Sequence, residues 1–276
     1  MWYNRGIMKI NSFISRLLDG EQVFLRGFLP FDECKIINRP LLDRSVNFTP
    51  VTAVIFAVPY WSGEHRGRNV SLYALPKDYH LWFRGLFDRL TAALKAEYPS
   101  FSFAGFADHS PIAEVSAAAS CGVGVVGDLG QLITKRYGSH VFIGEILTDM
   151  PADYTVTEAA HCPSCGACLS SCPYRGEDCF SFRNQAKGEL DAKTEELIRK
   201  TGIVWGCDIC RTCCPLNRNI EETPIDFFRD VDTEPLTSER VEAMTDGEFS
   251  SRAYSFRGRK TILRNLLVLE GGEKSK

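Results

Sequence analysis

The residues best suited to chemistry are the cysteines between positions 162 and 214, because their spacing is typical of iron–sulfur ligands. They follow two related patterns, Cys-x2-Cys-x2-Cys-x3-Cys-Pro and, further on, Cys-x2-Cys-x3-Cys-Pro. Two-residue gaps let one tight turn direct several thiolates at the same cube, and a cysteine followed by proline commonly binds the neighbouring cluster. We therefore assign two [4Fe-4S] clusters, one to Cys162, Cys165, Cys168 and Cys214, and the other to Cys172, Cys179, Cys207 and Cys210.

Zinc is the alternative metal, because pairs of Cys-x2-Cys also bind zinc. Zinc does not account for the x2-x2-x3-Pro run, so iron–sulfur clusters are favoured. Three cysteines lie outside the two ligand sets. Cys213 is expected to be a spare thiol beside a ligand, Cys121 a buried free thiol among small residues, and Cys34 a thiol without a nearby partner.

Composition indicates a globular protein in a reducing compartment. The chain has 276 residues, enough for one large or two modest domains, with 44% hydrophobic and 24% charged residues. Eleven cysteines with cluster spacing in a long chain argue against a disulfide scaffold, and no apolar run resembles a signal peptide or a membrane span. We therefore expect a cytoplasmic location. A formal charge of −3 argues against a strongly basic nucleic-acid binder, although a local basic patch stays possible.

The elements that must position these residues are predicted from hydrophobic periodicity. Apolar side chains at helical spacing from Ile10 to Leu18 predict an amphipathic helix that ends at Gly20. Alternating strands and helices follow, at 51–58 (strand), 77–98 (helix), 101–107 (strand), 111–120 (helix) and 141–147 (strand). This order predicts an α/β sheet with covering helices. Further on, 186–200 is expected to be a charged, helix-prone, solvated connector and 261–269 a short helix.

Asp108 is the candidate acid outside the cysteine region. It follows the strand at 101–107, and ligands bind at the carboxyl ends of strands in open α/β sheets. Since Pro111 suits the first turn of a helix, Asp108 could instead be only a helix cap. His109 is expected to be a surface loop residue. The glycines at 122–127 resemble a dinucleotide-binding turn but follow a helix, so they predict a loop of close backbone approach.

The order and spacing of several motifs resemble the epoxyqueuosine reductase family, enzymes of queuosine tRNA modification that use cobalamin and iron–sulfur clusters. The resemblance begins near residue 51 and runs to the end of the chain. The motifs that carry it are AVPYWSG (57–63), YALPKDYH (73–80), DHSPIAE (108–114), RYGSHVFIGEILTD (136–149), the first cysteine run, CFSF (179–182), GCDICRTCCP (206–215) and RNLLVL (264–269).

The resemblance implies an α/β (α+β) corrinoid-binding domain at 1–155, a ferredoxin-like double-cluster domain at 156–220 and a C-terminal helical extension at 221–276. It implies that Asp108 is the proton donor. It also implies that Ile143, Ser181 and Asp208 contact the corrinoid. The expected partners are tRNA and an electron donor such as a ferredoxin or flavodoxin, with no membrane.

Two departures from the family pattern bear on the substrate. The family's GxGWxGKN-like loop reads GVGVVGDL here, so Asp128 and Leu129 replace a Lys–Asn pair, and an acidic group repels phosphate. The family also has a helical-repeat domain that would follow residue 276. We therefore expect this sequence to be a short form of the family that binds tRNA more weakly. Three hypotheses follow: a reductase of epoxyqueuosine in tRNA, a corrinoid reductase with a different substrate, and a two-cluster electron carrier.

Overall fold

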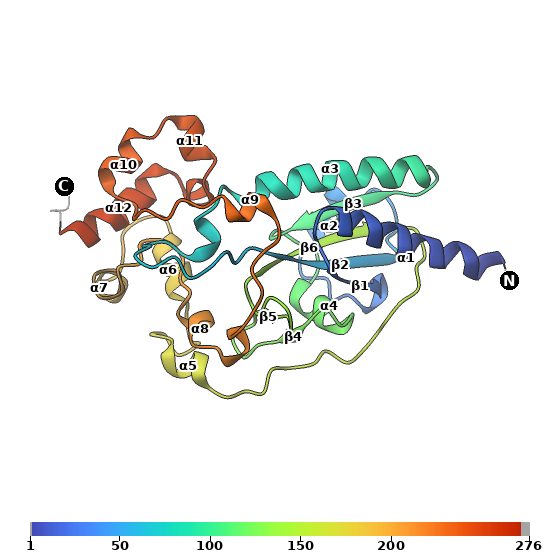
Figure 1. Cartoon of the computed structure of the whole chain (residues 1–276), viewed down its shortest axis with the longest axis horizontal. Helices are drawn as coiled ribbons and strands as arrows, with labels where there is room; N and C mark the ends of the chain where they lie inside the picture. Colours follow the sequence, from blue (N-terminus) through green and yellow to red (C-terminus); the bar gives the residue numbers. More distant parts are fainter. Residues whose placement is uncertain (1, 272–276) are drawn as a thin grey trace. The chain divides into compact units, whose positions relative to one another are not determined.

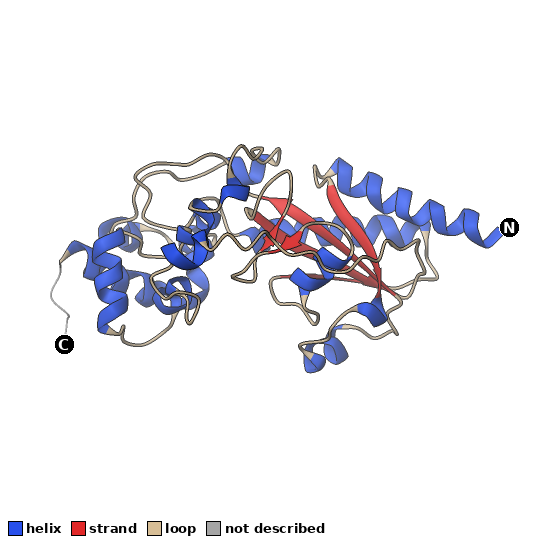
Figure 2. Cartoon of the chain, turned by 90° about the horizontal axis from the view of Figure 1, so that it is seen from below, coloured by secondary structure: helices blue, strands red, loops and turns tan. Residues whose placement is uncertain are grey.

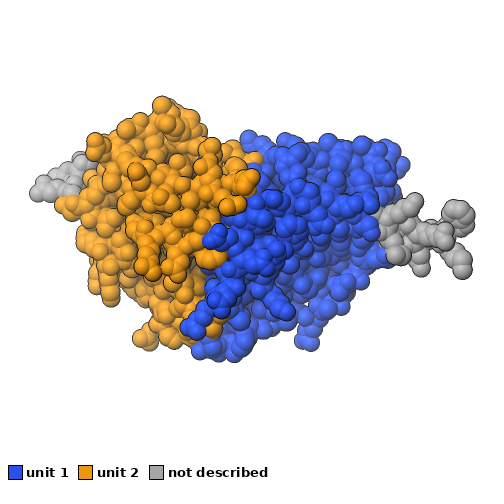
Figure 3. Space-filling model, viewed as in Figure 1, with its two compact units in different colours: residues 1–60, 82–165, 216–225 blue, residues 61–81, 166–215, 226–276 orange. Residues whose placement is uncertain are grey.

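The computed structural model of the chain describes residues 2–271, which form two compact units (Figures 1 and 3). The first unit comprises residues 1–60, 82–165 and 216–225, and the second comprises 61–81, 166–215 and 226–276. The chain passes between the units several times. The predicted boundaries at residues 155 and 220 both fall inside the first unit, and the division into three domains stays a prediction.

A four-stranded sheet in the order β1-β2-β6-β3 forms the centre of the first unit (Figure 2). Its strands are β1 (Leu25–Pro30), β2 (Thr52–Pro59), β6 (Val141–Thr148) and β3 (Phe103–Ala107). The three strands predicted from sequence are confirmed, and β1 was not predicted. Every residue of β2 is buried, which is why its apolar run carries no polar alternation.

All three strand pairings in this sheet are antiparallel. The predicted α/β sheet with covering helices is therefore corrected to an antiparallel sheet with helices packed on it. The sequence order of strands and helices does not specify strand direction, because an apolar run can be buried equally well in either orientation. The rule that ligands bind at the carboxyl edge of parallel strands therefore does not apply to Asp108.

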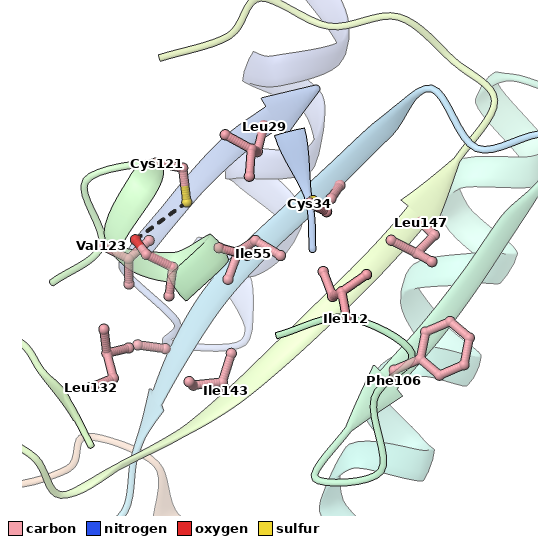
Figure 4. Close-up of a cluster of buried hydrophobic side chains, with 14 of the residues drawn as sticks. Leu29, Cys34, Ile55, Phe106, Ile112, Cys121, Val123, Leu132, Ile143 and Leu147 are labelled. Atoms are coloured by element: carbon pink, nitrogen blue, oxygen red, sulfur yellow. Dashed lines mark hydrogen bonds between the residues drawn. The ribbon is translucent and has the colours of Figure 1, made fainter. Parts of the chain in front are cut away.

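Helices pack on both faces of this sheet. On one face, Phe87 of α3 (Tyr79–Glu97) meets Phe56 of β2 edge to face, with ring centroids 6.4 Å apart. Helix α1 (Trp2–Gly20) lies beside α3, where Phe13 and Tyr98 make a similar contact at 5.6 Å. On the other face, α2 (Arg39–Ser45) and α4 (Glu114–Ser120) enclose a hydrophobic cluster around Ile55 (Figure 4).

The helices predicted at 10–20 and 77–98 are confirmed, whereas α2 was not predicted and α4 begins three residues later than expected. The glycine run forms a close-approach loop, as predicted, leading into β4 (Val125–Val126), which pairs with β5 (Leu132–Ile133). A Cβ on Gly124 would lie 2.6 Å from the carbonyl oxygen of Ile133, so no larger residue fits without displacing the backbone.

The second unit is made of short helices and loops. Its α-helices are α5 (Ala167–Ser171), α6 (Phe180–Gln185), α7 (Ala192–Thr201), α8 (Ile209–Thr212), α9 (Asp226–Arg229), α10 (Ser238–Ala243), α11 (Asp246–Ser250) and α12 (Arg259–Glu270). The 3-10 turns η2 (Leu72–Ala74) and η4 (Ala253–Arg257) also belong to it.

Helix α7 confirms that 186–200 is helix-prone and corrects the prediction that this segment is a solvated connector. Its Thr194 and Ile198 are fully buried, and the helix packs against α6 and α12. The charged residues that suggested a connector occupy only the outer face of an amphipathic helix. The predicted C-terminal helix is confirmed as α12, whose Ile262 and Leu266 are buried.

Candidate functional site

Two short helices of the second unit carry the cysteine motifs. Helix α5 holds Cys168 and ends just before Cys172, whose backbone N–H donates to the Cys168 carbonyl at 3.1 Å. Helix α8 holds Cys210 and ends just before Cys213. The two helices pack against each other. The related cysteine patterns therefore fold into related helical turns that lie side by side.

Three cysteines assigned to the second cluster lie close enough to influence one another electrostatically. Burial is the main reason that the pKa of the Cys207 thiol is raised to about 12, and the nearby acidic groups Asp208, Cys210 and Cys179 contribute to this value. Metal binding reverses this preference, because a thiol that coordinates a metal ion is deprotonated. Ionisation of several neighbouring thiols is therefore unfavourable without a metal and becomes favourable when they bind iron.

The predicted ligand sets differ in how the structure distributes them. All four ligands of the second cluster belong to the second unit, whereas the first set is divided between the units, with Cys162 and Cys165 in the first unit. Among the described residues, no group of three or more His, Cys, Asp or Glu side chains is placed so that it could hold a metal ion. The cluster assignment therefore rests on ligand chemistry and spacing, and stays a prediction.

The donor chemistry of the chain fits iron–sulfur clusters. None of the eleven cysteines, all of which lie within the described residues, forms a disulfide, and the eight assigned ligands are partly or fully exposed. The Cys213 thiol donates to the carbonyls of Ala167 and Cys210 at 3.4 and 3.5 Å, which fits the prediction of a spare thiol. Cys34 and Cys121 are buried in the core of the first unit, and burial raises the pKa of each to about 12 (Figure 4).

Asp108 lies directly after β3 in a strained turn. The backbone N–H of His109 donates to the Ala107 carbonyl at 2.7 Å, closing a three-residue turn with Asp108 at its centre and a φ of 64°. A γ-turn with positive φ at its central residue is rare and strained, and such strain is concentrated at functional sites. Both Asp108 and His109 are exposed, as predicted for His109.

The alternative prediction, that Asp108 caps the following helix, is wrong. Helix α4 begins at Glu114, its N-cap residue is Ala113, and no side chain caps it. Pro111 consequently lies ahead of the helix rather than in its first turn. The position of Asp108 in the sequence suggested a helix cap, and the structure shows that Asp108 does not have this role.

Two buried carboxyl groups near Asp108 were not predicted as site residues. Glu145 in β6 is fully buried, and the Ser110 hydroxyl lies 2.8 Å from both of its oxygens. The pKa of Glu145 is raised to about 8, mainly by burial and to a smaller extent by the charge of Glu114, whereas the Ser110 hydrogen bond lowers it. Burial also raises the pKa of Glu114 to about 7, with a further contribution from the charge of Asp108. Glu145 therefore retains its proton at neutral pH, whereas Glu114 is about half protonated there.

A signal for Glu145 was present in the sequence. It is the single charged residue in the otherwise apolar strand VFIGEILT, and a buried charge is costly unless it is neutralised or paired. Glu114 offered no such signal, because the first turn of a helix is an ordinary position for a glutamate. Its Oε2 atom is nonetheless buried without a hydrogen-bond partner.

The three residues predicted to contact a corrinoid have different surroundings. Ile143 packs in the hydrophobic cluster of the first unit (Figure 4). Ser181, in α6 of the second unit, accepts a hydrogen bond from the Gln185 amide at 2.7 Å and can still donate its own hydroxyl proton. The structure tests none of these contacts, which stay predictions.

Asp208 is 2% exposed and makes several contacts within the second unit. Its carboxylate accepts hydrogen bonds from the Ser71 hydroxyl and the Leu72 backbone N–H, each at 2.8 Å. It also pairs with Arg68 at 3.1 Å and Arg211 at 3.7 Å. A cavity of ≈ 330 Å³ adjoins this ion pair. The carboxylate thus holds the Cys207–Cys210 loop to the segment around residue 71.

Asp128, at the position where the resembling family has lysine, receives a hydrogen bond at 2.8 Å from the hydroxyl of Ser164. Ser164 lies between the predicted ligands Cys162 and Cys165. The acidic side chain therefore has a local structural partner in the first unit. None of the helices described between residues 2 and 271 is long and apolar enough to cross a membrane.

Comparison with known sequences identifies similar proteins. The chain is 30% identical to the epoxyqueuosine reductase of Listeria monocytogenes, a match that covers 99% of this chain and 79% of that protein. It is 29% identical to the epoxyqueuosine reductase of Lactococcus garvieae, over 75% of this chain but only 63% of that protein. The chain thus spans less than two thirds of some relatives. No protein-family model matches it.

Solved structures show the same fold. An epoxyqueuosine reductase crystallised with an epoxyqueuosine-modified tRNA-Tyr stem loop matches 95% of this chain with a TM-score of 0.79 and 22% identity, over 81% of its own length. The Bacillus subtilis epoxyqueuosine reductase, with its catalytic aspartate loop swung out of the active site, matches 95% of this chain and 81% of its own with a TM-score of 0.78 and 23% identity.

Proposed function

The chain belongs to the epoxyqueuosine reductase family, and from this premise we propose that it is an oxidoreductase that converts epoxyqueuosine in tRNA to queuosine. The reaction removes the epoxide oxygen and leaves a carbon–carbon double bond. It consumes two electrons and two protons for each epoxide and releases one water molecule. The protein must therefore supply electrons one after another and a proton at the departing oxygen.

Asp108 is the observation that carries this proposal. Its carboxyl group is exposed at the centre of a strained turn, and it does not cap α4. A general acid must reach the atom that it protonates, and an exposed side chain at the end of a strand can do so. The catalytic aspartate loop named for the Bacillus subtilis protein supports the same role here.

Electron supply is the part of the proposal that concerns the cysteines. We assign the eight predicted ligands to two [4Fe-4S] clusters, which transfer single electrons. A bound corrinoid would supply the two-electron nucleophilic chemistry at the epoxide. Of the residues proposed to hold it, Ser181 has a hydroxyl able to donate to the cofactor, whereas the Asp208 carboxylate is occupied by the protein and would act by positioning its loop.

The proposed partners are tRNA and an electron donor such as a ferredoxin or flavodoxin. The stem loop bound to the structural neighbour supports tRNA. We also propose a cytoplasmic location, supported by the eight cysteines at cluster spacing, which need a reducing compartment to remain available to iron.

A second candidate is a corrinoid reductase that acts on a different substrate. Asp128 favours it, because a carboxylate at the family's lysine position repels a phosphate backbone, and its hydrogen bond to Ser164 gives it a place in the local structure. The electron-carrier hypothesis differs from both in requiring no corrinoid, so the visible spectrum of the protein after incubation with cobalamin distinguishes it.

The decisive experiment is anaerobic reconstitution with iron, sulfide and cobalamin, followed by turnover on tRNA that carries epoxyqueuosine, with a low-potential chemical reductant in excess to supply the two electrons for each epoxide. We expect queuosine to form in the wild-type reaction. The Asp108→Asn variant should retain iron and corrinoid but lose a factor on the order of 10²–10⁴ in rate. His109→Asn, a change at the adjacent exposed residue, is the matched control. Absence of wild-type turnover despite full cofactor loading would refute the hypothesis that epoxyqueuosine in tRNA is the substrate. Equal rates for wild type and Asp108→Asn would refute the hypothesis that Asp108 is the proton donor.

A further inference from the structure

The backbone just ahead of Cys207 is paired with a buried asparagine side chain. The Asn184 amide nitrogen donates to the Gly206 carbonyl at 2.8 Å, and the Gly206 N–H donates to the Asn184 amide oxygen at 3.0 Å. Asn184 is fully buried. An asparagine side chain can donate and accept at the same time, so it binds a peptide group as a neighbouring strand would. This two-point contact fixes the position of Gly206 relative to α6.

A second buried asparagine fixes the first. Asn265, in α12, donates to the carbonyls of Asn184 and Val204 at 2.6 and 2.7 Å. Its own amide oxygen accepts from the guanidinium of Arg264 at 2.9 and 3.0 Å. The same guanidinium donates to the carbonyls of Asn184 and Ala186, at 3.2 and 2.9 Å. Helix α12 thus connects the end of α6 to the 204–206 segment.

The opposite side of this segment is equally constrained. Gly206 has a φ of 71°, and a Cβ at this position would lie 2.5 Å from the Ser71 Cβ. The Ser71 N–H donates to the Trp205 carbonyl at 2.8 Å, and the Val204 N–H donates to the Asn69 carbonyl at 2.7 Å. Gly206 therefore lies between the Asn184 amide and Ser71 with no space to shift toward either.

The pairing joins two segments that carry cysteines. Cys179 is the N-cap residue of α6, the helix that contains Asn184, and Cys207 directly follows Gly206. Both cysteines are assigned to the second cluster. We propose that the Asn184–Gly206 pair, held by Arg264 and Asn265, is a positioning device that sets the spacing of Cys179 and Cys207 and thereby retains the second cluster. This inference rests on the cluster assignment made under the proposed function.

The inference gives a role to the RNLLVL motif, whose first two residues are Arg264 and Asn265. Groups that orient metal ligands commonly contribute 10–100-fold to metal affinity. Loss of the Asn184 amide should therefore weaken the second cluster without removing any sulfur ligand. It should also alter the potential of that cluster, because solvent exposure and hydrogen bonding around the sulfurs set it.

The test uses Asn184→Asp, which keeps the shape but replaces the amide donor with an oxygen facing the Gly206 carbonyl. Asn69→Asp is the matched control, because the Asn69 side chain makes the same two-point contact with Leu236, at 2.7 and 2.8 Å, in the same unit. The contact of Asn69 with Val204 uses its backbone carbonyl, which this variant keeps. Leu236 does not adjoin a cysteine. Both variants should fold less stably by a similar amount, as measured by urea unfolding.

Only Asn184→Asp should release iron to a chelator about 10–100-fold faster than wild type. In a redox titration monitored by electron paramagnetic resonance, only this variant should show a shifted midpoint potential, and only for one of the two clusters. Equal iron release by both variants, or wild-type behaviour of Asn184→Asp, would overturn the inference. If wild-type protein binds no iron–sulfur cluster, the cluster assignment itself fails. If it binds two clusters but does not act on tRNA, only the proposed substrate fails and this test is unaffected.

Discussion

Replacing Glu145 with glutamine should change how the stability of the first unit depends on pH. Glu145 is fully buried in β6, and the groups that face it are the Ser110 hydroxyl, the Glu114 carboxyl and the Cys34 thiol. Burial raises its pKa from 4.5 to about 8. Between these two values the folded protein keeps the proton while the unfolded chain has lost it. Stability attributable to Glu145 is therefore fully present below pH 4.5 and is lost as pH rises through about 8.

The size of this effect follows from the pKa difference. Each pH unit above the unfolded pKa, up to the folded pKa, lowers the free energy of unfolding by about 1.4 kcal/mol, because Glu145 ionises in the unfolded chain but not in the folded protein. The free energy of unfolding is therefore lower by about 3 kcal/mol at pH 7 and by about 5 kcal/mol above pH 8. Glutamine has nearly the same shape and no charge. Glu145→Gln should therefore match wild type near pH 5 and exceed it by several kcal/mol at pH 9.

The assay is urea unfolding followed by circular dichroism at pH values from 5 to 9, under anaerobic conditions. Hydrogen exchange of the 141–148 peptide assigns the transition to the first unit, since two units need not unfold together. Glu158→Gln, at an exposed glutamate of the same unit, is the matched control and should keep the wild-type pH profile. Parallel profiles for wild type and Glu145→Gln from pH 5 to 9 would show that Glu145 does not hold a proton in the folded state.

Three further predictions concern the metal, the substrate and the buried ion pair. Anaerobic protein should contain about eight iron and eight sulfide per chain; Cys168→Ser should lose one cluster and Cys213→Ser none, whereas stoichiometric zinc without sulfide would contradict the assignment. Asp128→Lys should strengthen tRNA binding in a mobility shift and steepen its salt dependence, and unchanged binding would place this loop away from the phosphates. Asp208→Ala should destabilise the second unit by about 3–5 kcal/mol in urea unfolding, because the buried Ser71 hydroxyl and Leu72 N–H lose their acceptor and the partly buried Arg68 loses its carboxylate partner; a loss below 1 kcal/mol would argue that water replaces the carboxylate.

Much of the local structure could be predicted from sequence because its cause is local. The β-branched run at 51–58 predicts a buried strand, and the fully buried β2 confirms it. Helical spacing predicts α1, α3 and α12 for the same reason: each needs only a periodic apolar face. The cysteine spacing likewise depends on short-range geometry, since neighbouring thiols must turn toward one point. Family membership follows from such local motifs taken in order.

The tertiary structure decided which distant segments meet. Strand direction in the sheet, the burial of Glu145 and the amide pairing of Asn184 with Gly206 all depend on contacts between residues far apart in the chain. An apolar strand reads the same in either direction, and a glutamate or asparagine has the same letter whether solvated or buried. Even the capping role proposed for Asp108 was decided by where α4 begins. Sequence thus indicated most of the elements and predicted the metal-binding chemistry, whereas packing determined which polar groups lost their water and so acquired shifted pKa values or fixed partners.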